Sequence, residues 1–361
     1  MRDLGSPSPR FAYLEIATLF GRDGDEALIS YFSNLGFGQA TDTYIPPGMY
    51  PGWRSTDMRR GSFRVLITGH RSGSGLYPRV LHSGPHVSAV AFVTGDRAFT
   101  LNRAQEAGLN ILQRHAKLGD GSVYSTIEGP GGMNYIFTDG TGWGTDDGQL
   151  GTGSLDHIAV VTTRPGSRKV IDTHEALFGA GTWHPMPLTR LPNGEAIGSG
   201  FIRAGGVRVT IVWPVGERGC RQLTGFRAVT GGDGVQHAAL RVDGRIIPEV
   251  DEGRRLGAGF RDAPAAYYDV LEQRLGHPIP DLGDLKRTGV LADDDEYVDL
   301  EGRPHGIRQI FARPFGASDW GPFIELIDRG FGGETFGGRN VRALAESIEL
   351  DSLRGGRQAV S

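Results

Sequence analysis

The stretch Gly-Pro-Phe-Ile-Glu-Leu-Ile-Asp-Arg, residues 321–329, is a short apolar run with one carboxylate at its centre. Side chains of a strand alternate between its two faces, so we expect Phe323, Glu325 and Ile327 on one face. An unpaired carboxylate buried among such neighbours is costly and usually becomes protonated or finds a cation. A single glutamate in such a run more often faces solvent, so its interpretation depends on the rest of the chain.

Two earlier apolar runs each carry a histidine where this run carries its glutamate. Residues 155–161, LDHIAVV, contain His157, and residues 234–240, GVQHAAL, contain His237. The histidines are 80 residues apart, and Glu325 follows 88 residues later. Two histidines and one carboxylate are the ligand set of the facial triad that binds non-haem Fe(II) and leaves coordination positions open. A lone histidine is more often an ordinary core or surface residue, but three similar strands at similar intervals favour a metal site.

The composition excludes several other classes of protein. The 361 residues have a formal net charge of −4 and no long basic run, so neither nucleic acid nor an anionic membrane surface is indicated. The one cysteine, Cys220, rules out an intramolecular disulfide and cysteine-rich zinc or iron–sulfur sites. We find no apolar run of roughly 18 residues and no signal peptide near Met1. A soluble protein of the reducing cytoplasm is therefore expected.

The pattern of strands and helices predicts two domains, at residues 1–140 and 155–361, joined by a linker at 141–154 that is rich in Gly, Asp and Thr. The second half repeats the outline of the first. In this comparison Leu14 corresponds to His157 and Ala89 corresponds to His237, so the first half is predicted to bind no metal. Helices are predicted at 25–35, 97–108, 168–178, 248–256, 263–274 and 340–350, with short strands between most of them.

Several motifs of the second half, in order along the chain, resemble the family of 4-hydroxyphenylpyruvate dioxygenase and 4-hydroxymandelate synthase, within the vicinal-oxygen-chelate superfamily. They are DHIAV (156–160), GDGVQHAAL (232–240), DAPAAYYDVL (262–271), GVLADDDE (289–296), RQIFARP (308–314), FIELIDR (323–329) and TFGGRN (335–340). The resemblance implies an α+β fold of two vicinal-oxygen-chelate domains, built of βαβββ modules that form half-open barrels. It also implies that His157, His237 and Glu325 bind Fe(II).

The resemblance extends to residues of the substrate pocket. It implies substrate-binding roles for Ser199, Gln222, Gln236, Gln309, Phe311 and Phe336. Phe336 lies in a glycine-rich turn, which we expect to act as a lid over the reaction. Three positions depart from the dioxygenase pattern, where Gly216 replaces the family asparagine, Trp213 is unusually large, and Thr335 is closer to the mandelate synthase version. We expect all three positions to lie around the substrate ring.

The activity that the resemblance implies is oxidative decarboxylation of an aryl-2-oxo acid by O2, followed by hydroxylation of the product. Because the oxo acid is part of the substrate, no separate 2-oxoglutarate is required. Three alternatives stay open, namely benzylic hydroxylation as in 4-hydroxymandelate synthase, ring cleavage by an extradiol dioxygenase, and ligand binding without turnover. The expected partners are the oxo acid and O2, and a homodimer or homotetramer is expected.

Overall fold

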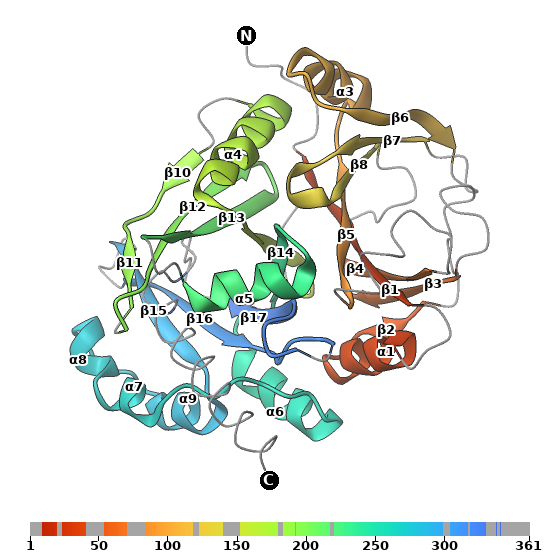
Figure 1. Ribbon diagram of the computed structural model, residues 1–361. Coiled ribbons are helices and arrows are strands. Elements are labelled where there is room, and N and C mark those ends of the chain that lie inside the picture. Colours follow the sequence, from red (N-terminus) through yellow and green to blue (C-terminus); the bar gives the residue numbers. More distant parts are fainter. Residues whose placement is uncertain are drawn as a thin grey trace.

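The computed structural model describes residues 9–19, 24–40, 54–70, 84–117, 123–139, 152–179, 183–191, 193–216, 220–298, 304–316 and 318–329, together with 337 and 340. Within these residues the chain forms two mixed sheets that lie side by side (Figure 1). The strand order is β2-β3-β4-β1-β5-β8-β7-β6 in the first sheet. In the second it is β10-β12-β13-β9-β14-β17-β16-β15, with β11 paired to β12.

Two strand–helix–strand modules make up the first sheet. The first module contains β1 (Arg10–Leu19), α1 (Gly24–Asn34), β2 (Gly38–Gln39), β3 (Arg54–Arg60) and β4 (Phe63–His70). The second contains β5 (His86–Val93), α3 (Arg97–Glu106), β6 (Ile111–Lys117), β7 (Val123–Glu128), a 3-10 turn (Pro130–Gly132) and β8 (Asn134–Thr138). In each module the first and last strands pair in parallel, and β1 joins the two modules by pairing antiparallel with β5.

The second sheet repeats this arrangement. Its first module contains β9 (Leu155–Val161), α4 (Arg164–Phe178), β10 (Trp183–Pro185), β11 (Thr189–Arg190), β12 (Ala196–Ala204) and β13 (Val207–Val215). After α5 (Arg221–Thr230), its second module contains β14 (Gly234–Arg241), α6 (Ile246–Leu256), α7 (Ala265–Asp269), α8 (Leu271–Leu275), α9 (Leu282–Thr288), β15 (Leu291–Val298), β16 (Pro304–Phe311) and β17 (Phe323–Asp328). β9, β14 and β17 are neighbours at the centre of the sheet.

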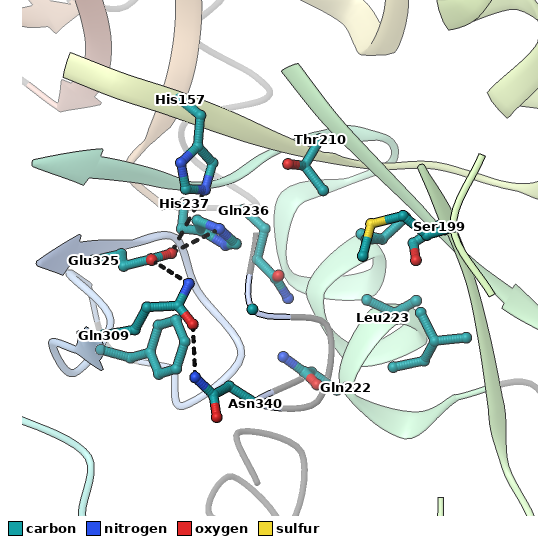
Figure 2. Close-up of a pocket in the computed structure, with 15 residues that line it drawn as sticks. His157, Ser199, Thr210, Gln222, Leu223, Gln236, His237, Gln309, Glu325 and Asn340 are labelled. Atoms are coloured by element: carbon teal, nitrogen blue, oxygen red, sulfur yellow. Dashed lines mark hydrogen bonds and ion pairs between the residues drawn. The ribbon is translucent and has the colours of Figure 1, made fainter. Parts of the chain in front are cut away.

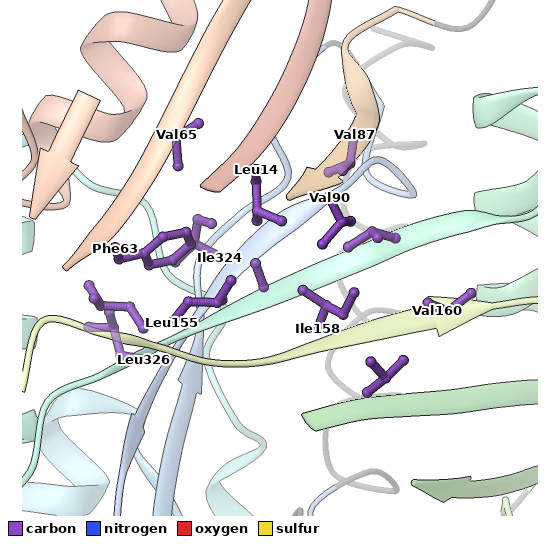
Figure 3. Packing of buried hydrophobic residues seen from close by; sticks show 14 of the residues in the cluster. Leu14, Phe63, Val65, Val87, Val90, Leu155, Ile158, Val160, Ile324 and Leu326 are labelled. Atoms are coloured by element: carbon purple, nitrogen blue, oxygen red, sulfur yellow. The ribbon is translucent and has the colours of Figure 1, made fainter. Parts of the chain in front are cut away.

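The outer faces of the two sheets pack on one another and form the largest core. Leu14 and Val90 of the first sheet belong to the same buried cluster as Ile158, Val160 and Ile324 of the second (Figure 3). The alternation of the strands explains this, since these aliphatic side chains share one face while their neighbours turn to the inner face. The inner faces of the two sheets therefore decide what each half can bind.

The predicted fold class is confirmed, because the described residues form four βαβββ modules in two sheets. The predicted helix at 263–274 is wrong in one respect, since it is divided into α7 and α8 at the β-branched Val270 (φ −114°, ψ 3°). Strands β3, β6 and β15 and helices α5 and α9 were not predicted. Most of the predicted linker and the helix at 340–350 lie outside the described residues, and the domain boundaries stay a prediction. In the part of the chain that is described, no helix is both long and apolar enough to cross a membrane.

Candidate metal centre and its pocket

A β-bulge lies beside each of the two candidate histidines. The pairing of β9 with β14 skips Asp156 on one strand and Gln236 on the other. A bulge breaks the strict alternation, so two successive residues turn to the same face. Leu155 and Ile158 accordingly face the core between the sheets, while Asp156 and His157 both face inward. Gln236 and His237 share the inner face in the same way, and both line one cavity.

The two histidines and Glu325 meet on the inner face of the second sheet (Figure 2). Candidate ligand atoms of the three side chains all lie within 4.8 Å of one another. Oε2 of Glu325 is 3.6 Å from Nε2 of His157 and 3.3 Å from Nε2 of His237. The sheet register brings this about, because Ala239 on the central strand β14 pairs with His157 on one side and with Glu325 on the other.

Burial changes the ionisation of all three groups. It lowers the pKa of His157, although Asp156 opposes this shift, and it lowers the pKa of His237, which also lies beside His157. Burial raises the pKa of Glu325 to about 8, and the hydrogen bond from Gln309 only partly opposes the increase. The isolated protein therefore contains two neutral imidazoles and a carboxyl group that favours its protonated form.

Asp156 sets the orientation of His157. Its Oδ1 lies 2.9 Å from Nδ1 of His157, so this nitrogen carries the proton and leaves the lone pair on Nε2, which faces Glu325. Arg329 donates to both oxygens of Asp156, at 2.7 and 2.8 Å. Burial alone would raise the pKa of Asp156, but Arg329 and His157 outweigh it and hold that pKa well below its usual range.

Aromatic side chains surround His237. Its ring stacks on Phe323 with centroids 5.1 Å apart, and the Phe311 ring lies at a steep angle 6.3 Å away. Nδ1 of His237 is buried and has no hydrogen-bond partner among the described residues. Packing therefore holds this imidazole in place, whereas a carboxylate orients the other one.

A cavity opens in front of the three groups, with about 620 Å³ of free space that is partly open to solvent. Five of the six side chains predicted to bind substrate line it, namely Ser199, Gln222, Gln236, Gln309 and Phe311. The sixth, Phe336, lies outside the described residues, as does Thr335. The predicted lid is therefore also outside them.

Trp213 is not part of this cavity, and its expected place around the substrate ring is wrong. On β13 the side chains of Thr210 and Val212 face the cavity, so the intervening positions face away. A side-chain carbon added at Gly198, the residue that pairs with Trp213, would lie 2.4 Å from the tryptophan ring. Trp213 thus lies across a glycine on the opposite face of the sheet.

Gly216 does not line the cavity either. It follows the end of β13 with a φ of +87°, and a carbon added to it would meet nothing within 4 Å. Its glycine provides a left-handed backbone after the strand. The expectation that Gly216 lies around the substrate ring therefore has no support in the structure.

Sequence reasoning missed several residues of the site. The cavity is also lined by Met186, Ile197, Thr210, Val212, Leu223, Gly337 and Asn340. Ile197 lies two residues before Ser199 on β12, so the period of two from that serine would have found it. Thr210 and Val212 share the face of Ser199 only through the pairing of β13 with β12. Asp156 was missed as an orienting group because strict alternation places it on the other face of β9, and only the bulge turns it inward.

The first sheet contains the same bulges without the ligands. The pairing of β1 with β5 skips Ala12 and Ser88. Tyr13 pairs with Ala91 as His157 pairs with Ala239, so Tyr13, and not Leu14, corresponds to His157. Leu14 faces the core between the sheets. Ala89 corresponds to His237 as predicted, and Ile136 corresponds to Glu325 through the pairing of β8 with β5.

Comparison with known proteins agrees with this geometry. Residues 13–137 match the model of the Glyoxalase/Bleomycin resistance protein/Dioxygenase superfamily. The chain is 27% identical to 4-hydroxyphenylpyruvate dioxygenase of Pseudomonas sp. (strain P.J. 874) over 327 residues, which cover 84% of this chain and 87% of that protein. It is 34% identical to 4-hydroxyphenylpyruvate dioxygenase of Caenorhabditis elegans over 157 residues, 41% of this chain and 37% of that protein.

A solved structure of a variant of 4-hydroxymandelate synthase from Streptomyces coelicolor matches with a TM-score of 0.75 and 26% identity. The match covers 96% of this chain and 99% of that one. These relatives support an enzyme of their class. The resemblance indicated by the sequence motifs is thus confirmed, and over most of its length the chain is similar to the 4-hydroxyphenylpyruvate dioxygenase and 4-hydroxymandelate synthase family, on the fold of the glyoxalase and dioxygenase superfamily.

Proposed function

We propose that this chain is an Fe(II)-dependent dioxygenase that oxidatively decarboxylates an aryl-2-oxo acid with O2 and hydroxylates the product. The observation that carries the proposal is the meeting of His157, His237 and Glu325 at the wall of a cavity that opens to solvent and is lined by both apolar and polar side chains. The names of the relatives supply the class of substrate.

The donor set fits a first-row divalent metal. Two neutral imidazoles and one carboxylate are its usual protein ligands, and they leave coordination positions open. Neighbouring ligands held roughly 2.1 Å from a metal are about 3 Å apart, close to the 3.3 and 3.6 Å that separate Glu325 from the two histidines. Because burial raises the pKa of Glu325, a cation would take the place of the proton. The choice of Fe(II) rests on the relatives.

The residues of the cavity would bind and orient the substrate. The side chains of Ile197, Val212, Leu223 and Phe311 offer an apolar wall for an aryl ring, and the hydroxyl and amide groups of Ser199, Thr210, Gln222 and Gln236 offer polar contacts. Held by His157, His237 and Glu325, Fe(II) would supply the redox chemistry by which O2 decarboxylates the oxo acid and hydroxylates the product. One atom of O2 would enter the new carboxylate and the other the hydroxyl group, while CO2 leaves.

A second candidate is hydroxylation at the benzylic carbon, as in 4-hydroxymandelate synthase. The match to that structure over 96% of this chain supports it. Extradiol ring cleavage and binding without turnover are less favoured, because the amide of Gln309 beside Glu325 belongs to the motif shared with the 2-oxo acid enzymes. The cytoplasmic location and the homo-oligomeric state stay predictions.

The test combines metal binding with product analysis. Purified protein reconstituted anaerobically with Fe(II) should bind one metal ion per chain, and His237→Ala should reduce this to less than about one tenth. With O2 and 4-hydroxyphenylpyruvate or phenylpyruvate, the protein should release CO2, and mass spectrometry and NMR should locate the new hydroxyl group. A benzylic hydroxyl group would favour the second candidate. Metal binding without O2 consumption on any aryl-2-oxo acid would contradict the proposal.

A further inference from the structure

Glu325 is the first member of a chain of three hydrogen bonds that leads away from the candidate metal centre. Its Oε1 accepts a hydrogen bond from Nε2 of Gln309 at 2.8 Å. Oε1 of Gln309 accepts one from Nδ2 of Asn340 at 2.9 Å, and Oδ1 of Asn340 accepts one from the hydroxyl of Tyr267 at 2.9 Å. We call these four residues the amide relay, and Figure 2 shows its first three members.

The hydroxyl of Tyr267 determines the direction of the relay. Its oxygen accepts hydrogen bonds from the backbone N–H of Ala292 at 2.9 Å and from Arg274 at 3.0 Å. Both groups are obligatory donors, so they occupy both lone pairs, and the hydroxyl has only its proton left to offer. The two acceptors within reach are the carbonyl of Ala292 and Oδ1 of Asn340, and the carbonyl also accepts from Arg274 at 2.6 Å.

The hydrogen bonds of the Tyr267 hydroxyl determine the orientation of the Asn340 amide and, through it, that of the Gln309 amide. Because both lone pairs of the Tyr267 hydroxyl are occupied, the NH₂ group of Asn340 finds no acceptor there, so Asn340 must present its oxygen to Tyr267 and its NH₂ group to Gln309. Gln309 must then present its own NH₂ group to Glu325. Once Glu325 is ionised, as a metal ligand must be, a reversed Gln309 would place an amide oxygen against a carboxylate, where both groups only accept. Gln309, Glu325 and Asn340 are all buried, so water cannot replace a missing donor at low cost.

The backbone at Gly337 leaves the Gln309 amide little room to move. Gly337 has a φ of +59°, and a carbon added to it would lie 2.1 Å from Oε1 of Gln309. The carbonyl of Gly337 also accepts a hydrogen bond from the backbone N–H of Asn340 at 2.8 Å. The close approach of the Gly337 backbone therefore keeps the side-chain amides of Gln309 and Asn340 in contact with each other.

We propose that Tyr267 is a positioning residue for the metal centre. By fixing the direction of the relay it makes Gln309 donate to Oε1 of Glu325, and this leaves Oε2, the oxygen that faces both histidines, to bind the metal. This inference rests on the proposed function in assuming that Glu325 is a ligand. Tyr267 does not line the cavity, and its ring packs against the cluster of Leu291, Phe311 and Phe323, whereas its hydroxyl acts through Asn340 and Gln309.

The test compares Tyr267→Phe with Tyr268→Phe. Tyr268 is the adjacent residue and is buried, and its ring lies edge-on to that of Tyr267 with centroids 5.0 Å apart. Its hydroxyl donates to the carbonyl of Val290 at 3.1 Å and takes no part in the hydrogen bonds of the relay. Anaerobic calorimetry with Fe(II) should show 10- to 100-fold weaker binding for Tyr267→Phe, as expected when a partner of a ligand is lost. Tyr268→Phe should bind Fe(II) within about twofold of the wild type. In a Gln309→Met background, which has no relay, Tyr267→Phe should have no further effect.

A second readout requires no metal. The side-chain amide signal of Gln309 in ¹⁵N NMR spectra, assigned by its loss in Gln309→Met, should shift in metal-free Tyr267→Phe and stay in place in Tyr268→Phe. An unchanged Gln309 signal, or equal loss of Fe(II) affinity in both tyrosine variants, would overturn the inference. A shifted signal with unchanged Fe(II) affinity would also overturn it. If the wild type binds no metal, the proposed function fails, and the positioning role fails with it even where the signal shifts.

Discussion

Arg329 donates two hydrogen bonds, of 2.7 and 2.8 Å, to the carboxylate of Asp156, and both side chains are almost completely buried. Arg329 follows β17, the strand that carries Glu325, whereas Asp156 precedes His157 on β9. The pair thus joins the strands that carry two candidate ligands. Arg208 and Arg241 approach the same carboxylate at 3.7 and 4.0 Å.

Replacing Asp156 with asparagine should reduce the free energy of unfolding of the metal-free protein by roughly 3–5 kcal/mol, because it removes the negative charge from the buried pair that Asp156 forms with Arg329. Asp251→Asn is the matched control, since Arg287 also donates two hydrogen bonds to the Asp251 carboxylate, but this pair is exposed at the surface. Its cost should be at most about 1 kcal/mol. Urea denaturation measures both values, and equal costs would show that burial of the Asp156 pair is not what matters.

A pH-dependent gain in stability is expected from Glu15→Gln. Burial raises the pKa of Glu15 from 4.5 to about 7, although Ser88 opposes the shift with a hydrogen bond of 3.2 Å. In the folded state the acid therefore keeps its proton between about pH 4.5 and 7, where the unfolded chain has lost it. Stability must fall as pH rises through this interval and stay low above it.

Glutamine retains an oxygen for Ser88 but has no proton to lose. It should raise the free energy of unfolding by about 1 kcal/mol at pH 5 and about 3 kcal/mol at pH 8. Urea denaturation at both pH values measures the difference from the wild type. Glu128→Gln, at an exposed position of the same sheet, controls for the loss of one negative charge. A gain that is the same at both pH values would refute the assignment.

Gly337→Ala and Gly216→Ala should separate a steric effect from backbone strain. Both glycines have positive φ, so both substitutions should cost about 1 kcal/mol of stability. Only the carbon at position 337 meets Gln309, whereas nothing lies within 4 Å of the one at position 216. Fe(II) affinity should therefore fall at least 10-fold in Gly337→Ala and hold in Gly216→Ala. Equal affinities would mean that the Gln309 amide moves aside freely.

Thr210→Val should change substrate binding without harming the fold. The Thr210 hydroxyl is buried at the cavity without a hydrogen-bond partner among the described residues, and valine has nearly the same shape. If the Thr210 hydroxyl forms a hydrogen bond with the ring hydroxyl of the substrate, KM for 4-hydroxyphenylpyruvate should rise about 10-fold in Thr210→Val, while KM for phenylpyruvate stays the same. Thr126→Val in the first sheet, where the hydroxyl is equally buried and unpaired, should leave both constants unchanged.

The three candidate ligands could be chosen from sequence because each is a ligand-type residue in a short apolar strand. Their convergence depends on pairing in the sheet, which the sequence pattern could not show. The bulges at Asp156 and Gln236 shift the alternation by one residue, and this is why Asp156 was missed. Leu14 was matched to His157 in place of Tyr13 because the pairing of β1 with β5 cannot be read from the sequence.

The pocket was only partly predictable. Ser199, Gln222 and Gln309 were named from the family resemblance and line the cavity, whereas Trp213 was misplaced because the resemblance gives a position along β13 but not a face. Asn340 and Tyr267 come from segments 73 residues apart, and only the folded chain shows their contact. Strands β3 and β6 were missed because charged and polar residues interrupt their apolar alternation.

The neighbouring positions of β9, β14 and β17 have a consequence for the order of folding. The strands touch in space, but long stretches of chain separate them, so two large loops must close before the three ligands can meet. The centre is consequently expected to form among the last events of folding. Binding of a metal ion added to refolding chains would therefore report when the second sheet is complete. A fragment that lacks any one of the three strands should bind no metal.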